Sequence, residues 1–158
     1  MFLSTYTMKV DKKGRVSLPA SWRAHLSADG FDGFIGFRSA THDAIDARGM
    51  RAFQALMAKL SAAAETKAGA FDAELFTDGA NPAGYLASVA VDVGFDGEGR
   101  LSLPASLKDV VGAGCEQLVF VGRNNFFQIW SAEAWAAQQA TERAAFDGRV
   151  RAARGGAA

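Results

Sequence analysis

A twelve-residue stretch occurs twice in this chain of 158 residues, at an offset of 85 positions. The first copy, residues 10–21, reads VDKKGRVSLPAS, and the second, residues 95–106, reads FDGEGRLSLPAS, so that eight of the twelve positions are identical. An internal duplication constrains the architecture more than any local pattern does, because both copies are then expected to form the same supersecondary unit. The two lysines at the centre of the first copy are replaced by glycine and glutamate in the second.

Short β-type runs flank the centre of the first copy, at residues 6–10 (YTMKV) and 15–18 (RVSL). Asp11 and Gly14 occupy the first and fourth positions between them, which suits a type I turn, because Asp bonds nearby amides and Gly tolerates positive φ. We therefore expect a β-hairpin with Lys12 and Lys13 at its tip.

The second copy keeps the same loop-shaping residues, which are Asp96, Gly99 and Arg100. Since an acid and an arginine stand four positions apart in both copies, we expect an ion pair across each turn, between Asp11 and Arg15 and between Asp96 and Arg100.

Each motif is predicted to continue into a helix and two more strands. Pro19 and Pro104 suit a first helical turn, and apolar residues follow at spacings of four. Further strands are expected at 33–38 and 43–47 in the first copy, and at 117–122 and 126–130 in the second. Longer helices should follow each unit, one carrying an apolar stripe that starts at Met50 and one capped by Ser131.

Four strands and a short helix in some 45 residues bury too little apolar surface to be stable alone. The predicted fold class is therefore α+β, mainly β, with two tandem β-β-α-β-β units that share one core, and with peripheral helices. Open strand edges and apolar helix faces would favour self-association.

The predicted division of the chain has four parts. Residues 1–54 form the first unit, 55–84 a helical and loop linker, 85–137 the second unit, and 138–158 the end of a C-terminal helix with a flexible tail. The linker is expected to break any helix at Asn81, Pro82 and Gly84. The tail GRVRAARGGAA lacks an apolar period and is expected to fray from residue 148 onward.

Composition excludes several classes of function. The chain is 49% apolar and 22% charged, as in globular proteins, and its single cysteine, Cys115, excludes an intrachain disulfide. The N-terminus lacks the features of a signal peptide, and no apolar run is long enough to span a membrane, so we expect a soluble intracellular protein. His25 and His42 have no partners at metal-ligand spacing, and no hydrolase or phosphate-binding motif occurs. We expect no metal, no cofactor and no enzymatic activity.

The formal net charge of zero conceals an opposition between the two copies. Residues 1–25 carry a net charge of +4, whereas the equivalent window, 86–110, carries −2. The cations of the first window are Lys9, Lys12, Lys13, Arg15 and Arg23. A charge run of this kind is typical of an ordinary solvated surface, but a basic hairpin tip also fits the DNA major groove, where Arg or Lys reaches guanine and lysines hold phosphates. The residues alone leave both interpretations open.

The stretches MFLSTYTMKVDKKGRVSLPASWR, DGEGRLSLPASL and VGRNNFFQIWSAEAW together resemble the MraZ family of the SpoVT-AbrB superfamily, over nearly all of residues 1–137. The resemblance implies two AbrB-like swapped-hairpin halves around one pseudo-symmetric β-barrel core. It further implies a cytoplasmic, nucleoid-associated transcriptional regulator of the cell-division and cell-wall gene cluster. Such a regulator assembles into homo-oligomeric rings that bind short G-rich direct repeats in double-stranded DNA upstream of that cluster.

In the family the first D-x-x-x-R loop is presented to DNA, and here it maps to Asp11–Arg15. We assign DNA contacts to Lys9, Lys12, Lys13 and Arg15. The residues expected to shape the two loops are Asp11, Gly14, Asp96, Gly99 and Arg100.

Two alternatives remain open from the sequence. One is an antitoxin-like protein that binds both DNA and a toxin, and the other is a ring-shaped interaction scaffold that does not touch DNA. Arg149, Arg151 and Arg154 of the tail either contact a phosphate backbone or are simply solvated.

Overall fold

Strands from both copies of the motif form one six-stranded antiparallel sheet in the computed structural model, which describes residues 1–68 and 81–155. In spatial order its strands are β1 (Thr5–Lys9), β7 (Gln117–Gly122), β8 (Phe127–Ser131), β4 (Ile45–Arg48), β3 (Gly33–Arg38) and β5 (Val91–Gly94). A separate antiparallel ribbon pairs β2 (Arg15–Ser17) with β6 (Arg100–Ser102). Every described ladder except β3–β4 and β7–β8 joins strands of different copies.

The sheet has an internal pseudo-twofold symmetry. If each strand is exchanged for its counterpart in the other copy, β1 for β5, β3 for β7 and β4 for β8, the strand order is reversed onto itself. The ribbon is likewise made of two counterparts, β2 and β6. The prediction that two tandem units share one β core is confirmed.

Short helices begin directly after the two motif prolines, as predicted. Helix α1 (Ala20–Ser27) follows Pro19, and α5 (Ala105–Val111) follows Pro104. Each places two apolar residues four apart in the core, where they are at most 6% exposed: Trp22 and Leu26 from α1, and Leu107 and Val111 from α5.

Aromatic packing fills the centre of the core. Trp22 is 2% exposed, and its ring centroid lies 5.4 Å from that of Phe2, 5.4 Å from that of Tyr6 and 5.0 Å from that of Phe127. These residues come from both halves of the chain, so the core cannot form without either half.

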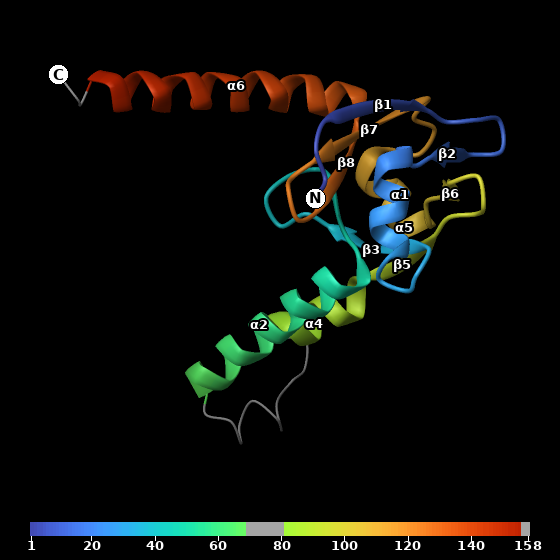
Figure 1. The fold of residues 1–158 in the computed structure, drawn as a ribbon, viewed down its shortest axis with the longest axis horizontal. Coiled ribbons are helices and arrows are strands. Elements are labelled where there is room, and N and C mark those ends of the chain that lie inside the picture. Colours follow the sequence, from blue (N-terminus) through green and yellow to red (C-terminus); the bar gives the residue numbers. More distant parts are fainter. Residues whose placement is uncertain (69–80, 156–158) are drawn as a thin grey trace.

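The three remaining described helices extend outward from this body (Figure 1). They are α2 (Met50–Ala68), α4 (Pro82–Val89) and α6 (Ala132–Gly155). Helix α6 begins where Ser131 accepts a hydrogen bond from the N–H of Ala134 at 3.2 Å, which confirms the predicted cap. It is held to the body by Trp135, which packs on Trp130, and by the ion pair between Arg123 and Glu142 at 2.5 Å.

The predicted simple hairpin at the first motif is wrong in one respect. The loop is present, but the strands on either side of it do not pair with each other: β1 pairs with β7, and β2 pairs with β6. A two-stranded hairpin is only marginally stable by itself, whereas each of these strands gains a ladder along the shared core by pairing with the other copy.

Two further expectations are corrected at the helix ends. Asn81 does not simply break a helix but caps one, since its side chain accepts the N–H of Ala83 at 2.9 Å, and α4 runs through Gly84. The tail expected to fray from residue 148 is helical to Gly155. Its alanines and arginines are strong helix formers, and Arg143 pairs with Asp147 one turn later at 3.1 Å.

The division into parts at 1–54, 55–84, 85–137 and 138–158 stays a proposal about the repeat units. Helices α2, α4 and α6 each run across one of these boundaries. Part of the predicted linker, residues 69–80, and the last three residues lie outside the described residues.

Replacing Trp22 with alanine should lower the free energy of unfolding by about 3–5 kcal/mol, because the cavity would open at the contact between the two halves. Urea denaturation measures this loss. Leu3→Ala is the control, since the Leu3 side chain is 60% exposed and its removal should change stability by no more than about 0.5 kcal/mol. Equal effects of the two substitutions would contradict the central place of Trp22.

Candidate nucleic-acid interface

The first loop, residues Asp11–Arg15, is a tight turn closed by backbone hydrogen bonds. The N–H of Gly14 donates to the carbonyl of Asp11 at 3.0 Å, and the N–H of Asp11 donates to the carbonyl of Arg15 at 2.8 Å. Gly14 has a φ of 78°, which a residue with a Cβ adopts only at a cost. The turn thus places Lys12 and Lys13 at its outer end, where both are exposed.

The carboxylate of Asp11 holds this loop together from inside. Its Oδ1 accepts the N–H groups of Lys13 at 2.9 Å and Arg15 at 2.8 Å, and its Oδ2 accepts Nε of Arg15 at 3.0 Å. The hydrogen bond from the Arg15 N–H is the main cause that holds the pKa of Asp11 below its ordinary value. The predicted ion pair across the turn is present.

The second loop, residues Asp96–Arg100, repeats this geometry. Asp96 Oδ1 accepts the N–H groups of Glu98 at 2.9 Å and Arg100 at 3.0 Å, and Oδ2 accepts Nε of Arg100 at 3.0 Å. Gly99 has the same φ of 78° as Gly14. The pKa of Asp96 is lowered for the same reason, first by the hydrogen bond from the Arg100 N–H. The aspartate, glycine and arginine that both loops share therefore account for the shape of the loops, and not for any difference between them.

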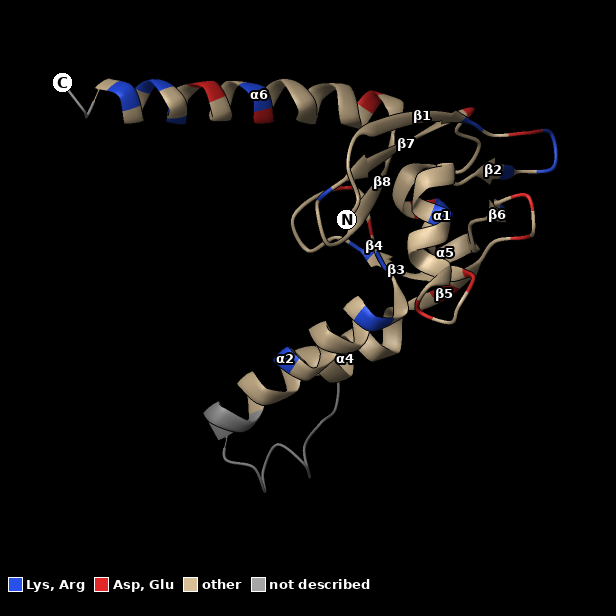
Figure 2. Ribbon diagram, viewed as in Figure 1, with Lys and Arg blue, Asp and Glu red and all other residues tan. Residues whose placement is uncertain are grey.

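The two loops differ in the charge that they present. Figure 2 shows them projecting from the same end of the molecule, the first basic and the second acidic. In the second loop Glu98 pairs with Nη2 of Arg100 at 3.4 Å. Lys13 stands at the equivalent position of the first loop, and no described residue accepts a hydrogen bond from Nη1 or Nη2 of Arg15. The outer face of the Arg15 guanidinium is therefore available to a ligand.

Because the copies exchange strands, the cation that follows each loop in the sequence lies beside the other loop. Arg23, counted above among the cations of the first window, donates from Nη1 to the carbonyl of Glu98 at 2.8 Å and packs against Gly99 in the second loop. Its counterpart at the 85-residue offset, Lys108 on α5, has its Nζ 3.8 Å from where a Cβ on Gly14 would lie. Lys108 thus adds a positive charge beside the first loop, which the sequence reasoning missed.

Lys9 lies further from the tip than the other predicted contacts. It ends β1, is exposed, and lines a surface hollow together with Glu116 and Glu133. The acids beside it reduce the positive potential there, so the basic surface is centred on Lys12, Lys13, Arg15 and Lys108.

Residues 1–68 and 81–155 hold no group of three or more His, Cys, Asp and Glu side chains able to bind a metal ion. Within the same ranges, no helix combines the length and the apolar character needed to cross a lipid bilayer.

The chain matches a family model described as "MraZ protein, putative antitoxin-like" over residues 1–71 and 86–154. It is 36% identical over 137 residues to the "Transcriptional regulator MraZ" of Pelagibacter ubique, which covers 85% of this chain and 81% of that protein. The proteins with the same description in Rickettsia felis and Rickettsia bellii are each 37% identical, cover 82% of this chain, and are themselves covered over 80% and 81% of their length.

The lowered pKa of Asp96 makes a testable contribution to stability. Because the folded pKa lies below that of the unfolded chain, the carboxylate stabilises the fold above about pH 4, and this contribution is lost as the pH falls through the folded pKa. Asp96→Asn should therefore show a weaker loss of stability than the parent between about pH 5 and pH 2. Urea denaturation across that range measures it, with the exposed Asp92→Asn as control. Identical pH profiles for Asp96→Asn and the parent would contradict this role.

Proposed function

The chain belongs to the MraZ family, and from this premise we propose that it is a transcriptional regulator that binds double-stranded DNA through the first loop. The observation that carries the proposal is the contrast between two loops of the same backbone shape. The Asp and Arg frame is present in both, but only the first loop presents Lys12, Lys13 and a guanidinium with free Nη atoms.

The loop has suitable chemistry for a DNA groove. Arg15 contacts a base edge or a close phosphate, Lys13 reaches into the groove, and Lys12 with Lys9 neutralises phosphates. Lys108, which stands beside Gly14, adds a further phosphate contact. Asp11 and Gly14 hold the loop in shape, as Asp96, Gly99 and Arg100 do in its acidic counterpart.

One loop with so few cations binds DNA weakly, so the proposal includes a homo-oligomeric ring. Several copies on short direct repeats would act together through their effective concentration. An apolar surface between α2, α4 and the body supports self-association: it lines a hollow of about 570 Å³. Its apolar residues include Leu56, Leu60, Leu86, Tyr85 and Val89, and the last two are 58% and 39% exposed. The regulated genes are those of the cell-division and cell-wall cluster, and the protein acts in the cytoplasm at the nucleoid.

The family description favours one second candidate, an antitoxin-like protein that binds a toxin as well as DNA. A partner-binding segment of that kind is expected to be acidic, whereas the outer part of α6 carries the exposed Arg149, Arg151 and Arg154. Co-purification of a toxin with the chain would support this alternative.

Arg15→Ala and Arg100→Ala form a matched pair, because each removes an ion pair with an aspartate at 3.0 Å. Arg100→Ala also removes the exposed pair with Glu98 at 3.4 Å, and exposed pairs contribute little to stability. Both should lower stability by similar amounts and leave the assembly intact in sedimentation. Only Arg15→Ala should abolish specific binding in a gel shift with the upstream DNA. Loss of binding by Arg100→Ala, with retention by Arg15→Ala, would overturn the assignment.

Replacing Lys12 and Lys13 together with alanine should weaken the salt dependence of DNA binding. For every copy engaged, the slope of log Kobs against log[salt] should become shallower by about 0.9 for each phosphate that is no longer neutralised. Titrations at several salt concentrations measure this, with Lys59→Ala on α2 as a control that removes a lysine at a remote exposed site. A parent protein whose binding shows no salt dependence would favour the interaction scaffold instead.

A further inference from the structure

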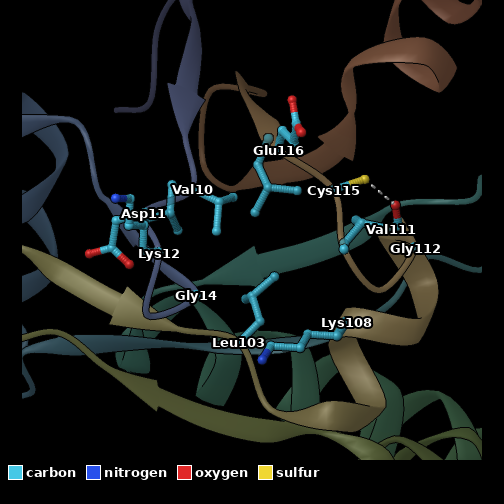
Figure 3. A pocket seen from close by; sticks show the side chains of 13 residues that line it. Val10, Asp11, Lys12, Gly14, Leu103, Lys108, Val111, Gly112, Cys115 and Glu116 are labelled. Carbon is cyan, nitrogen blue, oxygen red and sulfur yellow. Dashed lines mark hydrogen bonds between the residues drawn. The ribbon is translucent and has the colours of Figure 1, made fainter.

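A cavity of about 290 Å³ lies directly behind the first loop. One wall is the loop itself, and the opposite wall is α5 with residues 112–116 (Figure 3). Its floor is apolar and belongs to the core: Val16, Leu103 and Leu118 are between 2% and 6% exposed. A hollow with a floor of core residues, next to the proposed DNA contact, needs an explanation.

The pseudo-twofold symmetry gives each lining residue a counterpart near the second loop. The two copies differ in length between the short helix and the strand that follows it, so we assign counterparts in that segment from two backbone features. The N–H of Val10 donates to the carbonyl of Glu116 at 2.9 Å, and the N–H of Phe95 donates to the carbonyl of Asp32 at the same distance. Gly114 and Gly30 precede these acceptors by two residues and have φ values of 85° and 83°. Cys115 is therefore the counterpart of Phe31.

Five apolar side chains in the lining are smaller than their counterparts. The pairs are Val10 with Phe95, Cys115 with Phe31, Leu118 with Phe34, Val111 with Leu26, and Val16 with Leu101. In two of them a phenyl ring at the second loop, where Phe95 packs against the core and Phe31 is half-buried, is replaced by Val or Cys. A hollow of about 380 Å³ also lies at the second loop, but it has Phe95 in its wall, and none of Leu18, Phe34 and Leu101 lines it.

The fold therefore does not require a hollow with an apolar floor, because at the second loop the equivalent core residues, Leu18, Phe34 and Leu101, line no part of the hollow. The hollow is open to solvent on the side of its charged residues, so a ligand that covered its apolar floor would remove apolar surface from water. A cavity of about 150 Å³ holds a benzene molecule, so the volume here admits one substituted aromatic ring. The phenyl rings of Phe31 and Phe95 at the second loop have no equivalent at the first loop, where Cys115 and Val10 stand.

The rim of the cavity carries two cationic and two acidic side chains. Lys12 and Lys108 line it, with Asp11 and Glu116 as the acidic residues. The Asp11 carboxylate is engaged by Arg15 and by two backbone N–H groups. In Figure 3 the carboxylates of Asp11 and Glu116 point away from the cavity, whereas the Lys108 side chain runs along it towards Leu103. An anionic group at the rim would meet Lys108.

We propose that this cavity is a binding site for a small aromatic carboxylate, with the ring on Val16, Leu103 and Leu118 and the carboxylate on Lys108. Such a ligand would also lie against the backbone of the first loop. It would engage cations that otherwise face phosphate, so that its binding lowers the affinity for DNA. This last step rests on the proposed function, whereas the site itself does not.

Benzoate is the probe, compared with toluene, which lacks the carboxylate, and acetate, which lacks the ring. Saturation-transfer NMR on the full chain should detect benzoate with a Kd on the order of 1 mM, which is within reach of a ligand of about nine heavy atoms. Acetate should not bind. Lys108→Ala should weaken benzoate binding at least about tenfold without affecting toluene, while Lys59→Ala should change neither.

Cys115→Phe and Val10→Phe test the site by restoring the residues of the second loop. Each should keep the fold, measured by thermal melting, and abolish benzoate binding; if one fails to fold, the other decides. No binding of benzoate to the parent up to about 10 mM, or equal binding by a folded Phe variant, would overturn the proposal.

A gel shift with and without benzoate tests the coupling to DNA. Benzoate should reduce the DNA affinity of the parent but not that of Cys115→Phe. Unchanged DNA affinity at saturating benzoate would overturn the coupling alone. If the parent binds no DNA under any condition but still binds benzoate, the proposed function fails and the cavity site stands.

Discussion

Exchange of strands between the two copies of the motif is the constraint on which this structure depends. Because β2 pairs with β6 and β1 pairs with β7, neither copy can complete a sheet or a core by itself. The ribbon of β2 and β6 also fixes the two loops, since each loop leads directly into one of its strands. The same exchange puts Arg23 on the second loop and Lys108 beside the first.

Duplication separates the requirements of folding from those of binding. Both loops keep an aspartate that accepts two backbone N–H groups and one arginine Nε, so their shape is maintained regardless of charge. The differences gather at the first loop, which carries Lys12 and Lys13 and which has the apolar cavity behind it. A second copy that supplies the fold leaves the first free to acquire a ligand.

Local sequence patterns were sufficient to predict the positions of the helices and strands in each unit and the hydrogen-bonded turn of each loop. The spacing of Asp11, Gly14 and Arg15 predicted the turn and its ion pair, because these depend on residues within five positions of one another. Strand pairing was not predictable in this way. Val16 shows no preference in the sequence for Leu101 over a neighbour in its own hairpin, and the choice depends on the core that both copies build. The helical tail was missed because helix propensity was given too little weight against the absence of an apolar period.

The sequence by itself determined that there are two equivalent units, that each has a braced turn, and that the turns have opposite charge. These are properties of residue identity and short spacing. Only the tertiary structure decided which cation stands beside which loop and where space is left in the core. Both result from strand exchange, because contacts between residues 75 to 87 positions apart are set by the packing of the whole core and leave no local signal.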